Sequence, residues 1–154
     1  MRPKLVIENF IKGDNVPEVP EIEIQNGIFY KHHPIHRNRM QGESQWSIAL
    51  TAERDCFRRT LEEHWILNNN AGWGLHFENN ALTYLGVGRD HITPVFIAKF
   101  VDRNRSSIWH GYPADYRCDE NDVPPHEVLK KWYETGIIPD AKVRKIMGRQ
   151  PCKP

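Results

Sequence analysis

Cysteine is scarce in this sequence. The three that occur, Cys56, Cys118 and Cys152, lie too far apart to form a C-x-x-C pair. Without such a pair, cysteine alone indicates neither a zinc site nor a dithiol redox centre. Free thiols in a reducing compartment account most simply for an odd number of widely spaced cysteines. We therefore expect no intramolecular disulfide and a cytoplasmic protein.

Long hydrophobic runs and an excess of one charge are lacking as well. The opening residues, MRPKLVIENFIKGD, contain only short apolar runs broken by charged residues, so they indicate neither a signal peptide nor a membrane span. Lys and Arg number 21 against 20 Asp and Glu, so the net charge does not indicate a polyanionic partner. We expect no membrane association, and the sequence leaves the oligomeric state open.

Diagnostic functional motifs are also absent. The sequence contains no glycine-rich nucleotide loop, no G-x-S-x-G nucleophile motif and no paired metal-binding histidine motif. We therefore predict neither a cofactor nor a bound metal, and function has to be inferred from local clusters of reactive side chains.

The secondary-structure signals predict one α+β domain over residues 1–154. Residues 1–20 read as an extended segment, residues 21–116 as an antiparallel sheet with one central helix, and residues 124–150 as a pair of short helices. Asn26-Gly27, between two β-prone runs, predicts a two-residue hairpin turn of type I′.

The remaining elements follow from hydrophobic periodicity. We predict Thr51 as the N-cap of a helix over residues 52–67. Alternating apolar residues predict strands over 45–50, 73–78, 81–87, 93–101 and 107–112, of which 93–101 is the most apolar and therefore central. Helical stripes follow over residues 126–136 and 139–148.

Three segments carry candidate chemistry, and the first is YKHHPIHRNR, residues 30–39. Its histidines and cations suit an anion such as phosphate, with Lys31, Arg37 and Arg39 as contacts. The alternatives are a solvated loop or a metal site. Pro34 disfavours the metal site because it prevents a regular helix between His32 and His36.

The second segment is SIWHGYPADY, residues 107–116. His110 could act as a general acid or base, with Tyr112 or Asp115 orienting it. The structural alternative is a strand that leaves the sheet, in which Gly111 marks a bulge or a close backbone approach and Pro113 ends the hydrogen-bond ladder.

A shared groove would make this segment a metal-independent ribonuclease site. If His76 and His110 faced the same side of the sheet, one imidazole could serve as the base and the other as the acid, with Lys99 or Arg103 binding the phosphate. The strand order that decides this cannot be read from the sequence.

The third segment is the basic C-terminal region. Lys142, Arg144, Lys145 and Arg149 could contact nucleic acid, but the pattern favours an ordinary solvated basic helix face.

Two functions remain open from the sequence. One is a protein that binds RNA or DNA, with RNA cleavage by histidine acid–base chemistry as the more specific hypothesis. The other is a non-catalytic module or accessory subunit whose exposed aromatic side chains bind a protein partner; the candidates are Trp109, Tyr112, Tyr116 and Trp132.

Overall fold

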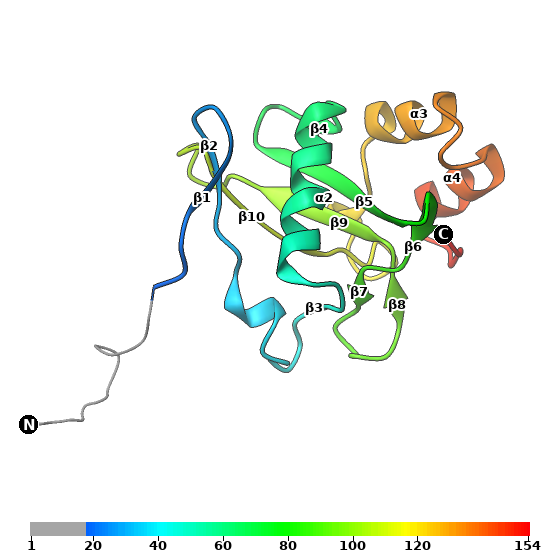
Figure 1. Cartoon of the computed structure of the whole chain (residues 1–154). Coiled ribbons are helices and arrows are strands. Elements are labelled where there is room, and N and C mark those ends of the chain that lie inside the picture. The colour runs from blue at the N-terminus through cyan, green and yellow to red at the C-terminus, as the bar shows by residue number, and fades with distance from the viewer. Residues whose placement is uncertain (1–17) are drawn as a thin grey trace, which may run out of the picture.

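The structure, a computed structural model, describes residues 18–154 (Figure 1). The predicted extended segment over residues 1–20 therefore lies outside the described residues, apart from its last three. Over residues 18–154, no helix is long and apolar enough to cross a bilayer.

The fold is α+β, as the sequence predicts, and is built on a seven-stranded sheet. Its strands follow the order β1-β2-β10-β9-β5-β4, with β6 paired to β5: β1 Ile22–Gln25, β2 Ile28–Tyr30, β10 Ile108–Pro113, β9 Ile97–Val101, β5 Ala71–Glu78, β4 Ile66–Leu67 and β6 Ala81–Thr83. A small second sheet has the order β3 Gln45–Trp46, β7 Gly86–Val87 and β8 Pro94–Val95.

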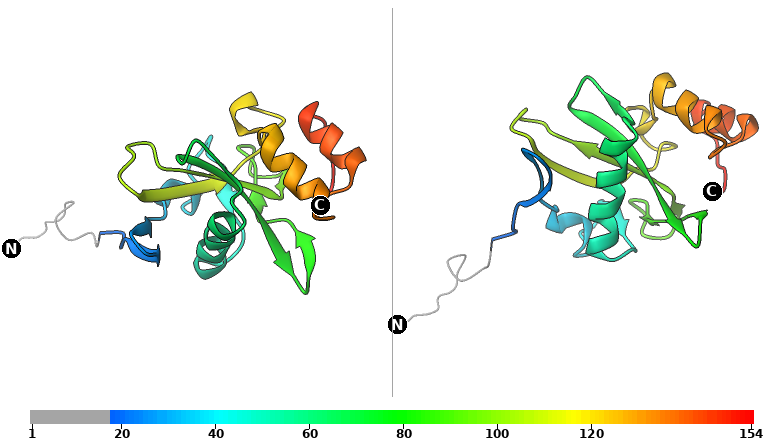
Figure 2. Two further views of the ribbon diagram at one scale, coloured as in Figure 1. Left: turned by 90° about the horizontal axis from the view of Figure 1, so that it is seen from above. Right: turned by 45° about the horizontal axis from the view of Figure 1, so that its top comes forward.

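Helices cover both faces of the main sheet (Figure 2). Helix α2, Leu50–Glu62, packs against β5 on one face, which we call the α2 face. Helices α3, His126–Glu134, and α4, Asp140–Met147, lie on the other, which we call the α3/α4 face. Two short 3₁₀ turns, η2 Pro34–His36 and η3 Glu120–Asp122, lie in loops.

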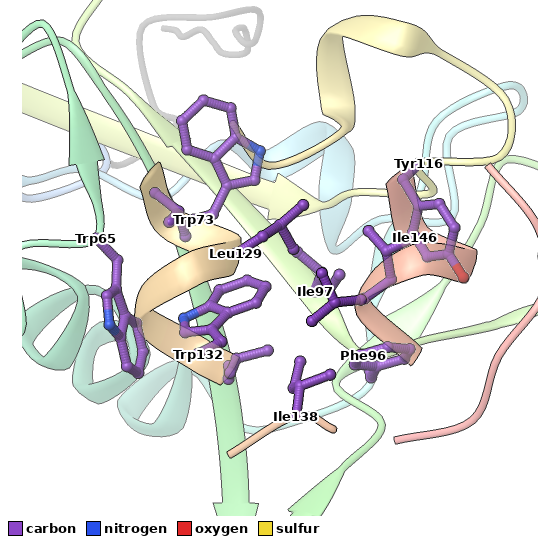
Figure 3. Close-up of a cluster of buried hydrophobic side chains, with 12 residues drawn as sticks. Trp65, Trp73, Phe96, Ile97, Tyr116, Leu129, Trp132, Ile138 and Ile146 are labelled. Carbon is purple, nitrogen blue, oxygen red and sulfur yellow. The ribbon is translucent and has the colours of Figure 1, made fainter. Parts of the chain in front are cut away.

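A separate hydrophobic cluster fills each face because alternate strand residues point to opposite sides of a sheet. On the α2 face, Phe57 packs against Phe100 and Trp109. On the α3/α4 face, Trp132 lies among strand residues and packs edge-on against Trp65 (Figure 3). This face of the core also holds Trp73, Phe96, Ile97, Tyr116, Leu129, Ile138 and Ile146.

Most predicted elements are present, but several boundaries differ. The strand predicted over residues 45–50 is reduced to β3, because helix α2 begins at Leu50 and has Ala49, not Thr51, as its N-cap. The helix also ends before residue 67, because His64 adopts a positive φ and redirects the chain so that Trp65 enters the core. The most apolar strand, β9, is internal, as predicted.

One pairing departs from the predicted antiparallel arrangement. Strand β10 pairs with β9 antiparallel but with β2 in parallel, so it lies inside the sheet. Gly111 makes the close approach predicted for it: a Cβ at this position would lie 2.3 Å from Cδ1 of Phe100. Pro113 is the last residue of the strand.

Candidate functional site

The parallel pairing of β10 with β2 brings a second histidine segment beside His110. Trp109 lies opposite Tyr30, and the Lys31 N–H donates to the Trp109 carbonyl at 2.8 Å. The chain that follows β2 therefore continues alongside His110. This segment carries His33 and His36.

Three imidazoles converge as a result. The ring centroids of His33 and His110 are 5.8 Å apart, and those of His33 and His36 are also 5.8 Å apart. The ring of His36 stacks on Tyr112 with the centroids 5.3 Å apart. We call His33, His36 and His110 the histidine cluster.

The histidine cluster lines a cavity of about 310 Å³. Arg103, from the loop between β9 and β10, also lines it and is exposed to solvent. No acidic residue within residues 18–154 forms an ion pair with Arg103. Its guanidinium is therefore available to an anion that enters the cavity.

A buried carboxylate holds the loop that carries His33 and His36. Glu53 of α2 is fully buried and accepts hydrogen bonds from the Tyr30 hydroxyl and from Arg37 Nε, the latter at 2.8 Å. Arg37 also donates to the Ile48 carbonyl at 3.0 Å. Arg37, predicted to contact nucleic acid, is thus engaged inside the protein, because Glu53 needs a cationic partner.

One hydrogen bond to each of the two loop histidines identifies which ring nitrogen carries the proton. His36 Nδ1 lies 2.8 Å from the Ser44 carbonyl oxygen, which only accepts, so His36 is protonated at Nδ1. The Ile35 N–H donates to His33 Nδ1 at 3.4 Å. Neutral His33 therefore carries its proton on Nε2.

Burial and positive charge keep His110 neutral. Desolvation is the main cause that lowers its pKa to about 4, and the nearby Arg103 guanidinium adds to the effect. Burial likewise lowers the pKa of His36. At neutral pH the His110 ring can therefore accept a proton.

Tyr112 and Asp115 do not orient His110 as the sequence suggested. The Tyr112 hydroxyl donates to Asp122 Oδ1 at 2.6 Å, and burial together with this bond raises its pKa. The Asp115 carboxylate accepts two hydrogen bonds from the guanidinium of Arg117, at 2.9 and 2.8 Å. Both residues line the cavity, but their polar groups are bound elsewhere.

His76 lies on the opposite face of the sheet from His110. His76 is two residues from Gly74 in β5 and therefore points to the same face of the sheet. A Cβ at Gly74 would meet side chains of α2, and His76 itself lines a small cavity with Ala52 and Arg59 of that helix. His110 is adjacent to Gly111, which faces Phe100 in the α2-face cluster, so His110 points to the α3/α4 face. The groove hypothesised for His76 and His110 is therefore wrong, and His76 pairs with Glu78 at 2.9 Å.

Lys99, the other cation considered for phosphate, is also occupied. Its ammonium group donates to the Asn121 carbonyl at 2.6 Å and lies 5.4 Å from the centroid of the Trp73 ring. Of the two cations considered for the phosphate, Arg103 shares the cavity with His110; Arg89 lines it too but lies 3.8 Å from Asp119.

The other predicted nucleic-acid contacts are distributed over several places. Lys31 lines a cavity of about 400 Å³ that also includes His33 and His110, whereas Arg39 lines one beside Trp46. The four C-terminal cations have different surroundings. Lys142 and Lys145 line a cavity of about 540 Å³. Arg144 pairs with Asp140 at 2.9 Å, and Arg149 donates to the carbonyls of Tyr116 and Arg117.

The aromatic residues proposed to bind a protein partner are mostly buried. Trp109 is 4% exposed, Tyr116 is 5% exposed and Trp132 is fully buried. These side chains pack within the two hydrophobic clusters, so they form no exposed aromatic surface.

Two members of the histidine cluster, His33 and His36, were not among the acid–base candidates from the sequence. Their segment was identified only as an anion-binding or metal-binding loop. Nothing in the sequence signals that β2 and β10 pair in parallel, and only this pairing places the loop beside His110. Within residues 18–154, no three His, Cys, Asp or Glu side chains are grouped so that they could hold a metal ion.

No family model, curated protein or solved structure matches this chain.

Proposed function

We propose that this protein is a cytoplasmic, metal-independent RNA-cleaving enzyme whose active site is the cavity of the histidine cluster. The observation that carries the proposal is the meeting of His33, His110 and Arg103 in one cavity. These are the three groups that such a reaction needs: a base, an acid and a cation for the phosphate. The three free cysteines fit a reducing compartment.

The reaction begins with proton abstraction by His110. Because its pKa lies near 4, the ring is neutral and takes the proton of a ribose 2′-hydroxyl. The O2′ oxygen then attacks the adjacent phosphorus, and the P–O5′ bond breaks.

His33 supplies the proton that the leaving O5′ oxygen needs. His33 is exposed at the mouth of the cavity, where it can exchange protons with solvent and serve as the acid. The products are a 2′,3′-cyclic phosphate and a 5′-hydroxyl. Solvent then removes the proton from His110 and returns one to His33.

Arg103 and His36 have supporting roles. Arg103 binds the phosphate oxygens and balances the charge that develops on them. His36 is a positioning residue: its ring is fixed by Ser44 and by stacking on Tyr112, and it packs edge-on against His33.

The test is cleavage of a single-stranded RNA oligonucleotide in the presence of EDTA. We expect a 2′,3′-cyclic phosphate product, no cleavage of the DNA of the same sequence, and a loss of about 10²-fold or more in rate for His110→Gln and His33→Gln. His76→Gln, on the other face of the sheet, is the matched control and should retain full activity. An inactive wild-type protein, or equal rates for all four proteins, would overturn the proposal.

A further inference from the structure

Three cavities follow one another along β10 and the residues after it. The 400 Å³ cavity includes Ile108, Trp109 and His110, and the 310 Å³ cavity continues from His110 to Pro113 and Asp115. The 540 Å³ cavity includes residues 114–117. We call the 400 Å³ cavity the Lys31 cavity, the 310 Å³ cavity the histidine cavity and the 540 Å³ cavity the α4 cavity.

Neighbouring cavities share lining side chains, so the three adjoin one another. We call this row of cavities the track. His33 and His110 line both the Lys31 cavity and the histidine cavity. Asp115 lines both the histidine cavity and the α4 cavity. Strand geometry places Ala114 about 20 Å from Ile108, so the track is longer than one nucleotide.

Each cavity along the track has its own cation. Lys31 lies at one end, Arg103 in the middle, and Lys142 and Lys145 at the α4 end. One N–H of Lys142 Nζ donates to the Pro154 carbonyl at 3.1 Å, which leaves its other two N–H groups for a phosphate. Lys31, Arg103 and Lys145 are exposed, and none of them forms an ion pair with an acidic residue of the described chain. This spacing of cations suits a chain of phosphates rather than one isolated anion.

Two of the acidic side chains that line the track are paired with arginines. Asp115 is paired with Arg117 at 2.8 Å, and Asp119 lies 3.8 Å from Arg89. Asp122 accepts the Tyr112 hydroxyl, and burial raises its pKa. The remaining acidic residues of the track are Glu43 in the histidine cavity and Glu21 in the Lys31 cavity.

The α4 cavity combines an apolar floor with a basic rim. The accessible apolar lining is formed by Tyr84, Pro94 and Pro151, because Phe96, Ile97 and Ala114 are buried. Lys145 and Lys153 are exposed at the rim. Figure 3 shows Phe96 on the same side of the hydrophobic cluster as Tyr116, and Ile97 in the middle of the cluster. A flat base can contact the floor while its phosphate meets a lysine, as in proteins that bind single-stranded nucleic acids.

We propose that a single strand of RNA binds along this track, with its scissile phosphate at His33 and His110, one flank in the Lys31 cavity and the other extending to Lys142 and Lys145. This inference rests on the proposed function and names its substrate: an unpaired RNA segment of roughly four or more nucleotides. The α4 cavity is then a binding subsite remote from the reacting phosphate.

The test measures binding of uncleavable 2′-O-methyl RNA oligonucleotides of increasing length by fluorescence anisotropy. Affinity should rise from the dinucleotide to the hexanucleotide. The double variant Lys142→Gln/Lys145→Gln should weaken hexanucleotide binding about tenfold and reduce the salt slope by about 1.4, because two contacts to single-strand phosphates are lost. Lys145→Gln alone should produce part of this loss.

Arg144→Gln is the matched control, since Arg144 lies on the same helix but pairs with Asp140 and lines no part of the track. It should bind the hexanucleotide like the wild type. Cleavage of a dinucleotide by the double variant should also remain at the wild-type rate, because the reacting groups are untouched.

The two proposals fail in different ways. If the dinucleotide is cleaved but affinity is independent of length and of Lys142 and Lys145, the track is wrong and the proposed function stands. If length-dependent binding requires these lysines but no RNA is cleaved, the proposed function is wrong and the binding track stands. Tighter binding of duplex RNA than of the single strand would also overturn the track.

Discussion

The ionisation state of His110 is the residue-level feature on which the proposed chemistry depends. Its ring is half-buried on the α3/α4 face of β10, next to Arg103 and two other imidazoles. Each of these surroundings disfavours the imidazolium form. A histidine of this kind stays available as a base in solutions well below neutral pH.

The pH dependence of kcat/KM for RNA cleavage follows from this. Activity should fall on the acidic side as His110 becomes protonated, and this limb should lie near pH 4 rather than near 6.5. In Arg103→Gln, removal of the neighbouring cation favours the protonated ring, so the limb should move to higher pH even though the rate is lower. Initial rates over the acidic range, on protein shown to be folded at each pH, provide the measurement. A limb near pH 6.5 in both proteins would contradict this account of His110.

At the scale of elements, the sequence was most informative where the signal is local. The hairpin tip at Asn26-Gly27 joins β1 to β2 as predicted, but only Gly27 of the two has a positive φ, so the turn is not type I′. Asn79-Asn80, between β5 and β6, has a positive φ at both residues. Local rules located both turns without fixing their conformations.

Pairings between distant segments were not predictable in the same way. A parallel pair has no tight turn between its strands, and 78 residues lie between Tyr30 and its partner Trp109. His33 and His36 therefore gave no sign that they lie beside His110. Buried Glu53 was equally hidden, because a glutamate in the first turn of a helix is ordinarily explained by the helix dipole.

The hairpin turn provides a test at this scale. Gly27→Val should lower the free energy of unfolding by about 1 kcal/mol or more, because a β-branched residue is strained at a φ of +78°. A Cβ at Gly27 would meet no atom within 4 Å, so the loss reports backbone strain alone. Gly27→Asn is the control and should cost less, since asparagine tolerates this region. Urea denaturation of the three proteins gives the comparison, and equal stability of the Val variant and the wild type would show that the turn is placed wrongly.

For the whole molecule, the sequence predicted the class and the order of elements but not the sides of the sheet. The α+β organisation, the internal position of β9 and the C-terminal helix pair are all present. Which face each histidine occupies depends on strand order and on where α2 packs. This is why His76 was grouped with His110, although the sheet separates them.

The central claim is that side chains from two distant parts of the chain, His33 and His110, act together on one phosphate. Single-turnover cleavage of one RNA oligonucleotide by the wild type, His33→Gln, His110→Gln and the double variant tests this claim most directly. The double variant should be no slower than the slower single variant, because loss of either histidine already disables the reaction in which the two transfer protons together. Rate losses that multiply in the double variant, or a single variant that retains the wild-type rate, would contradict the account.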